Sequence, residues 1–483
     1  MKPALAVQYF RQTMRKKIIG VAICFATVLV SSAVLAEEKA LPAPGQSIPQ
    51  PLTLDYVLST VDDNHPDVQS AQAQVDYQIA LQNQVESETG LNITLQGKAS
   101  YIEPPAISPD QSNNDSRLSL LVQKNLYDFG RSNAASAAAV AEVKGSEQLL
   151  MMTKNKHRID IMAAFFEVLL ADLTYIRDNE AMATAYVQYD HMRQRNKVGE
   201  RSDIDVMELK KDYEEARRKL YTSRSRQRST RSRLANMMNR PGELVAEVAD
   251  PTLKMIDEKP GDVDQYLRLA EENNTQLKAL RLGVQAAENR VKSARAGIRP
   301  VLKGRLEVSD YAREMGGYND YEASLILDVP LWTGGAVQAG VAKETANLQR
   351  LRAQLRAQEM QVQQAVLETW QALDNLRAER EETQSLMDYR DLYLDRSRAL
   401  YDMEVKTDLG DSMVKISDAQ LRMARAKYKT ALALAKLNAL MGRPVYPFEA
   451  LPGTKSAQAG KVPGANNDLQ KKQKSEPAEE PKQ

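Results

Sequence analysis

Two stretches of the chain are proline-free and far longer than an ordinary helix. They run from Arg131 to Lys197 and from Ala336 to Met403. Helices of globular proteins average about 11–12 residues, whereas a helix of about 67 residues with a rise of ~1.5 Å per residue is about 100 Å long. In the second stretch, apolar side chains recur every seven residues, at Val341, Leu348, Leu355 and Val362. This spacing predicts a coiled-coil-like seam, so we expect the long helices to pack side by side.

The sequence also repeats itself at long range. Gly130 and Gly334 are 204 positions apart, and Pro241 and Pro444 are 203 positions apart. Each half predicts the same order of elements: a helix of about 35 residues, two strands, a very long helix, a short break and a last helix of about 35 residues. We therefore divide the core into a first repeat, residues 52–245, and a second repeat, residues 246–447.

Four segments alternate between apolar and polar side chains as strands do. They lie at 91–101, 117–126, 302–309 and 322–331. Each is about ten residues long, which is the length that a tilted strand needs to cross the hydrocarbon of a bilayer. A small soluble sheet with one buried face is the alternative. Four membrane strands cannot close a sheet without exposed edges, so several copies of the chain are expected to associate, giving eight strands from two or twelve from three.

The two ends of the chain have their own composition. A basic cluster at Arg15–Lys17, an apolar run and small residues up to Ala36 predict a secretory signal peptide over residues 1–36, with a single anchor helix as the alternative. Residues 37–51 read as a proline-rich leader and residues 448–483 as a disordered tail. The only cysteine, Cys24, falls in the predicted signal, so no disulfide or thiolate site is expected in the mature chain.

No part of the sequence predicts an enzyme, a cofactor or a metal site. The three histidines, His65, His157 and His191, are far apart in the sequence, and we expect each to be exposed. Gly335 and Gly340 have the spacing of the glycines in a phosphate loop, but Val341 replaces the lysine. The 65 basic and 64 acidic residues are nearly balanced, which argues against nucleic-acid binding and fits long solvated helix faces.

Four patterns, in order along the chain, resemble one family. They are the opening at Leu52–Val68, the break at Gly199–Val206, the strand exit at Val329–Gly335 and the last helix from Ser417 to Gly442. Together with the duplication, they resemble the TolC-like outer-membrane factors, or outer membrane efflux proteins, of tripartite efflux pumps and type I secretion systems. The resemblance covers residues 50–447.

The resemblance implies a mainly helical fold with a membrane sheet, in which duplicated long-helix hairpins and four strands per chain close as a trimeric α/β barrel. It implies a homotrimer in outer-membrane lipid, with twelve strands in the membrane and a twelve-helix tunnel in the periplasm. It also implies a periplasmic adaptor and an inner-membrane transporter of RND or ABC type as partners. The chain would then be a passive duct from the periplasm to the exterior.

In this family the periplasmic end closes where the two breaks between helices meet, and acidic residues often ring the constriction. The corresponding candidates are Gly199, Asp203, Asp205, Asp408, Gly410, Asp411 and Asp418. Ser202 and Asp205 also have the spacing of a capping box, so the aspartates are open to a purely structural interpretation as helix caps or solvated faces. Asp205 and Asp418 match acidic tip positions by their spacing, whereas Gly410 lies later than the pattern predicts.

Two other functions fit parts of the pattern. A duct dedicated to protein or adhesin secretion would have the same fold with a different client. A soluble periplasmic coiled-coil scaffold with a small sheet would form no pore.

Overall fold

The computed structural model describes residues 48–60, 65–253, 256, 259–313, 319–405 and 408–448. The predicted signal peptide and most of the predicted leader and tail lie outside these residues. The chain divides into two units, Met1–Pro49 and Gln50–Gln483. Everything described below belongs to the second unit.

The element order of this unit is mainly helical. It comprises α2 (Leu54–Thr60), α3 (Pro66–Ser87), β1 (Leu91–Lys98), β2 (Arg117–Tyr127), α4 (Arg131–Lys197), α5 (Asp203–Met237), α6 (Val263–Asn273), α7 (Thr275–Arg295), the short 3-10 helix η1 (Ala296–Ile298), β3 (Val301–Tyr311), β4 (Tyr321–Asp328), α8 (Ala336–Asp402) and α9 (Leu409–Leu440). The predicted fold class, long helices with one four-stranded sheet, is confirmed.

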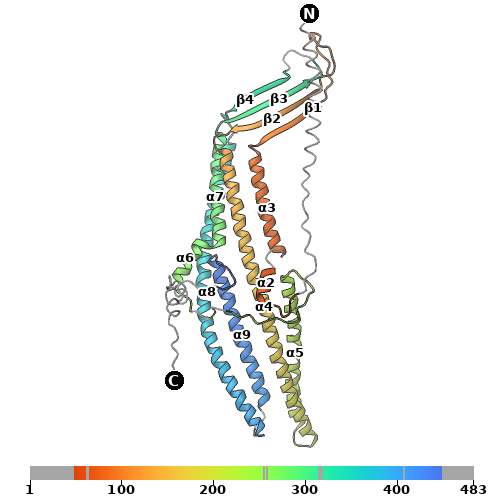
Figure 1. The fold of residues 1–483 in the computed structure, drawn as a ribbon, viewed down its shortest axis with the longest axis vertical. Coiled ribbons are helices and arrows are strands. Elements are labelled where there is room, and N and C mark those ends of the chain that lie inside the picture. The colour runs from red at the N-terminus through yellow and green to blue at the C-terminus, as the bar shows by residue number, and fades with distance from the viewer. Residues whose placement is uncertain are drawn as a thin grey trace, which may run out of the picture. The chain divides into compact units, whose positions relative to one another are not determined.

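All four strands form one antiparallel sheet in the order β1-β2-β3-β4 (Figure 1). The two hairpins come from the two halves of the chain, and β2 joins β3 with Arg117 opposite Tyr311. The β2–β3 register shifts between Asn125 and Tyr127, just before the chain leaves the sheet. Strands β1 and β4 are the edges, so the sheet of one chain is open.

The two faces of the sheet differ in chemistry. Along one face the register aligns Ile93 with Val122, and Val122 with Leu306. Many apolar side chains of this face are exposed, among them Leu91, Ile93, Leu95, Leu118, Leu120, Leu306, Leu325 and Leu327. On the other face, buried Ser119 and Ser309 are hydrogen-bonded at 2.8 Å. The sheet therefore carries a contiguous exposed apolar face, which is unusual for a surface in contact with water.

Helices α4 and α8 each begin directly after a strand and each contain 67 residues. Gly130 and Gly335 precede them with φ of 92° and 83°. This left-handed conformation is readily adopted by glycine, and it turns the chain from the strand into the helix. The two long helices that the proline-free stretches predict are thereby confirmed, with α8 ending one residue before Met403.

The helices pack as a layer below the sheet. Near the sheet, α3 lies on α4, α4 on α7, and α7 on α8, whereas further away α5 lies on α4 and α9 lies on both α4 and α8 (Figure 1). Alanines allow the close approach of α4 and α7, because Ala138, Ala141 and Ala286 form one buried cluster. In the predicted heptad seam, Leu348 and Val362 are buried, whereas Val341 and Leu355 are half-buried.

One part of the predicted order is wrong. The opening helix of each half is not a single segment of about 35 residues: α3 has 22 residues and α7 has 21. A capping side chain starts each of them. His65 accepts a hydrogen bond from the Asp67 amide, and Asn274 accepts from the Gln276 and Leu277 amides. Such caps satisfy amides that have no partner inside the helix, so each helix begins afresh. The boundaries of the two repeats, at 245 and 447, remain a prediction.

No helix in the described part of the chain is both long enough and apolar enough to cross a membrane.

Candidate functional site

The first break, between α4 and α5, is a compact helix end. The Glu200 amide donates to the Arg195 carbonyl at 3.0 Å, and the Gly199 amide donates to the Asn196 carbonyl at 2.9 Å. Gly199 has φ of 82°. Hydrogen bonds of this kind with a left-handed residue satisfy the last carbonyls of a helix. Gly199 therefore ends α4, and a Cβ there would contact nothing within 4 Å.

The two aspartates after this break are held by local hydrogen bonds. Ser202 and Asp205 form a capping box: the Asp205 amide donates to Ser202 Oγ at 3.3 Å, and the Ser202 amide donates to Asp205 Oδ2 at 3.2 Å. Asn196 Nδ2 donates to Asp203 Oδ1 at 3.0 Å across the break. The helix-capping interpretation of these aspartates thus has direct geometric support.

The second break, between α8 and α9, has the equivalent pair of backbone hydrogen bonds, but its left-handed residue is not a glycine. The Val405 amide donates to the Leu400 carbonyl at 3.0 Å, and the Glu404 amide donates to the Tyr401 carbonyl at 2.9 Å. Glu404 has φ of 56° and occupies the place that Gly199 has in the first break. Sequence reasoning missed Glu404, although it follows Gly199 at nearly the spacing of the duplication. The expectation that Gly410 belongs to this break is wrong, because Gly410 is the second residue of α9.

Gly410 instead marks a close approach between α9 and α4. A Cβ at this position would lie 2.9 Å from Cγ2 of Thr184. Thr184 is 13 residues before the end of α4, so about 20 Å of that helix continues beyond the contact at ~1.5 Å per residue. Helix α9 therefore begins beside α4 about 20 Å before α4 ends, although the two hairpins end at nearly the same level in Figure 1.

The aspartates at the start of α9 have different environments. Asp408 precedes the helix and accepts a hydrogen bond from the Tyr393 hydroxyl of α8 at 3.0 Å. Its carbonyl also accepts from the Ser412 amide at 3.0 Å. Asp411 lies exposed in the first turn, where a negative charge is favourable near the positive end of the helix dipole.

Asp418 takes part in a polar latch that joins α9 to α4. Arg177 Nη1 lies 3.3 Å from Asp418 Oδ1, and Arg422 Nε lies 2.8 Å from Asp418 Oδ2. Arg177 also binds the buried Asp178 at 2.7 Å. Burial lowers the pKa of Arg177, but hydrogen bonds and charges from Asp178 and Asp418 outweigh it, so the pKa is raised. Close by, the Ser417 hydroxyl donates to Glu180.

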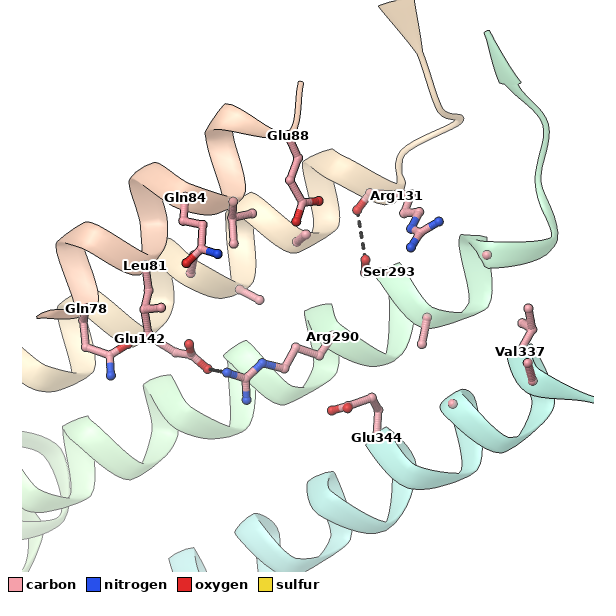
Figure 2. Close-up of a pocket in the computed structure, with 18 residues that line it drawn as sticks. Gln78, Leu81, Gln84, Glu88, Arg131, Glu142, Arg290, Ser293, Val337 and Glu344 are labelled. Atoms are coloured by element: carbon pink, nitrogen blue, oxygen red, sulfur yellow. Dashed lines mark hydrogen bonds and ion pairs between the residues drawn. The ribbon is translucent and has the colours of Figure 1, made fainter. Parts of the chain in front are cut away.

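A cavity of about 660 Å³ lies where α3, α4, α7 and α8 converge near the sheet. Figure 2 shows Glu142 of α4 paired with Arg290 of α7, and Glu344 of α8 on the other side of Arg290. Burial raises the pKa of Glu142; Arg290 opposes this, whereas Glu344 adds to it, and the pKa is raised. Small side chains such as Ala138 line the rest of the cavity. The helices thus form a hollow with a mostly apolar lining that carries the Glu142–Arg290 ion pair.

The described residues offer no metal site: no three or more His, Cys, Asp or Glu side chains among them are grouped to hold a metal ion. The histidines do not all behave as the sequence suggested. His157 is buried and His65 is half-buried, with their ring centroids 3.9 Å apart, so the expectation that each histidine is exposed is confirmed for His191 alone. The two lie together because α3 packs on α4, and their separation in the sequence hides this.

Residues 266–443 match the family model described as outer membrane efflux protein. No curated protein matches the sequence. The solved structures with a similar fold include a membrane protein from Pseudomonas aeruginosa, which is 16% identical with a TM-score of 0.67, over 81% of this chain and 90% of that one.

Two further structures are outer-membrane proteins of other bacteria. The outer membrane protein VceC from Vibrio cholerae is 16% identical, with a TM-score of 0.66 over 81% of this chain and 96% of that one. The MtrE outer membrane channel of Neisseria gonorrhoeae is 16% identical, with a TM-score of 0.63 over 81% of this chain and 89% of that one.

The match over residues 266–443 and the shared fold confirm the resemblance to TolC-like outer-membrane channels that the sequence predicts.

Proposed function

We propose that the chain is one of three identical subunits of an outer-membrane efflux duct. The observation that carries this proposal is the open sheet: it has two unpaired edges, β1 and β4, and an exposed apolar face. Edges are not tolerated in hydrocarbon, and joining β4 of one copy to β1 of the next removes them. Three copies give twelve strands, which leave an open lumen, whereas two copies give eight, whose interior side chains fill.

The helices continue the duct away from the membrane. Both α4 and α8 start at the sheet and extend for about 100 Å at ~1.5 Å per residue. In three copies, the helices would form a tunnel through the periplasm.

The two breaks form the periplasmic end of this duct in our proposal. The latch between Arg177 and Asp418 ties α9 to α4 near this end, so it would hold the end in one arrangement. Asp203, Asp205, Asp408 and Asp411 would add negative charge around the opening. Rings of acidic side chains favour cations in a channel.

The duct would work with two partners. Exposed apolar side chains gather at both breaks, namely Val198, Ile204 and Met207 at the first and Met403 and Val405 at the second. Such exposed groups are typical of protein contacts, and we assign them to a periplasmic adaptor. The adaptor would connect the duct to an inner-membrane transporter of RND or ABC type, which supplies the energy.

Efflux of small molecules is the client function that the family description favours, and a type I protein-secretion duct is the second candidate. The two differ in the transporter that binds the adaptor. Reconstituting transport with an RND-type or an ABC-type partner separates them, because only the cognate assembly exports its cargo.

The test of the duct itself is conductance. The full chain, purified from outer membranes, is expected to be trimeric by native mass measurement and to conduct ions in planar bilayers. As a control, Leu325→Lys on the exposed apolar face should impair insertion, because a lysine on the lipid side costs about 2–4 kcal/mol at mid-depth. A soluble periplasmic product without conductance would show the chain to be a scaffold instead.

A further inference from the structure

The distal helices of one chain form a row whose two outer members carry opposite charge. Helix α5 packs on α4, α4 on α9, and α9 on α8, so α5 and α8 lie at the two margins of the row (Figure 1). When copies close into a ring, as the proposed trimeric duct requires, the α5 margin of one copy comes next to the α8 margin of another. The inference below rests on that proposed function.

The outer face of α5 is strongly basic. Residues 216–233 contain eight basic side chains and no acidic ones. Four of them form ion pairs inside the chain. Arg231 binds Asp172 at 2.7 Å and Arg233 binds Glu167 at 3.0 Å, both on α4. Within α5, Arg217 lies 3.4 Å from Glu214 and Lys219 lies 2.9 Å from Glu215. Arg218, Arg224 and Arg228 are exposed instead. Arg218 and Arg228 lie on the face opposite the buried side chains Ser223, Thr230 and Leu234, and Arg224 lies at the side of the helix between the two faces.

The outer face of α8 is acidic over a similar length. Residues 374–395 contain seven acidic and three basic side chains. Glu379 binds Lys429 of α9 at 3.3 Å, and within α8 Glu381 lies 3.6 Å from Arg377 and Asp395 lies 3.5 Å from Arg398, on the exposed surface. The six acidic side chains other than Glu379 are exposed: Asp374, Glu381, Glu382, Asp388, Asp391 and Asp395. The side of α8 toward α9 is marked by the buried Ser397, whose hydroxyl lies 2.8 Å from that of Ser412.

The two charged faces overlap in height along the bundle. Arg224 and Arg228 lie about 32 and 38 Å up α5 from the first break, at ~1.5 Å per residue. The contact between Gly410 and Thr184 places the start of α9 about 20 Å above the end of α4, and Ser397 of α8 is level with Ser412 of α9, since their hydroxyls are 2.8 Å apart. Counted from Ser397, Asp395, Asp391 and Asp388 lie about 26, 32 and 36 Å above the first break. The arginines and the aspartates therefore face the same level.

We propose that the basic face of α5, centred on Arg224 and Arg228, docks against the acidic face of α8, centred on Asp388, Asp391 and Asp395, of a second copy of this chain. The opposite charges of the two margins and their matching height indicate that a second copy of the chain occupies this surface. Single exposed ion pairs are weak and screened by salt, so the seam depends on several of them acting together. It closes the distal tunnel between subunits, where β-strand pairing does not reach.

Zero-length carbodiimide crosslinking tests the seam, because this reagent joins a lysine amine only to a carboxylate in contact with it. In the full chain, Arg224→Lys with Arg228→Lys keeps the charge and adds two amines. We expect heat-denatured dimers in which an α5 peptide is joined to an α8 peptide from residues 374–395. Adding Asp388→Asn, Asp391→Asn and Asp395→Asn should lower the yield at least about tenfold, and 1 M salt should lower it severalfold.

Arg425→Lys is the matched control. Arg425 is also exposed, but it lies on α9 within the row rather than at its margin, so its lysine should form no link to α8 of another copy. If the preparation is trimeric and conducts but shows no α5–α8 link, the seam is refuted and the duct stands. If the lysines react only after an acidic periplasmic protein is added, that protein is the occupant and the seam is likewise refuted. A monomeric, non-conducting product refutes both proposals.

Discussion

The two breaks end a long helix in the same way but with different residues. Both long helices end with the same pair of hydrogen bonds and a residue of positive φ, which is Gly199 in the first break and Glu404 in the second. After the first break, a capping box starts α5. After the second, α9 starts at Asp408, whose side chain bonds to Tyr393 of α8 rather than capping the helix. The first hairpin is therefore held by its own turn, and the second is held by contacts with neighbouring helices.

If this contrast is correct, the largest loss of stability should follow from disturbing the contact between the two hairpins. Gly410→Val would place its side chain against Thr184, since a Cβ alone would already lie 2.9 Å from it. Overpacking of this kind costs about 1–3 kcal/mol, so the melting temperature followed by circular dichroism should fall clearly. Thr184→Gly in the same chain should restore most of the loss. Equal stability of Gly410→Val and the natural chain would show that α9 does not depend on α4 here.

The polar latch between Arg177 and Asp418 gives a second test of whether α9 depends on its contacts with α4. Arg177→Met removes the partner of buried Asp178 and one partner of Asp418. Leaving a buried polar group unsatisfied costs about 1–3 kcal/mol, so stability should fall, and the distal end of α9 should exchange its amide hydrogens faster. Arg422→Met is the control, because Arg422 contacts only the exposed side of Asp418 within α9. If both variants exchange alike, the latch does not join the helices.

The sequence predicted the features that depend on local patterns and missed those that depend on contacts between distant residues. Proline-free length predicted α4 and α8, and alternation predicted all four strands, because both are local patterns. The end of α8 was predicted to within one residue, but the turn residue of the second break was not, because glycine was taken as its marker and Glu404 has no local signature of positive φ. The contacts between Gly410 and Thr184, between Arg177 and Asp418, and between His65 and His157 join residues far apart in sequence. A single sequence carries no pattern for them.

Exchanging the two turn residues tests the symmetry of the breaks directly. A residue with a side chain costs roughly 1–2 kcal/mol in the left-handed conformation, whereas glycine adopts it readily. Glu404→Gly should therefore raise the melting temperature, and Gly199→Glu should lower it by a similar amount. Because nothing lies within 4 Å of a Cβ at Gly199, the loss reports backbone strain rather than a clash. A drop in stability with Glu404→Gly would mean that the glutamate side chain itself holds the second turn.

The smallest expected effect distinguishes the two helix starts. Ser202→Ala removes the side-chain acceptor of the capping box of α5, and loss of such a cap costs about 0.5–2 kcal/mol. Asp411→Asn removes only a charge from the first turn of α9, which is worth about 0.3–1 kcal/mol at a surface position. Hydrogen exchange of the first-turn amides should therefore accelerate more for α5 in Ser202→Ala than for α9 in Asp411→Asn. If α9 frays as strongly as α5, its start depends on its own charge and not on the contacts of Asp408 and Gly410 with α8 and α4.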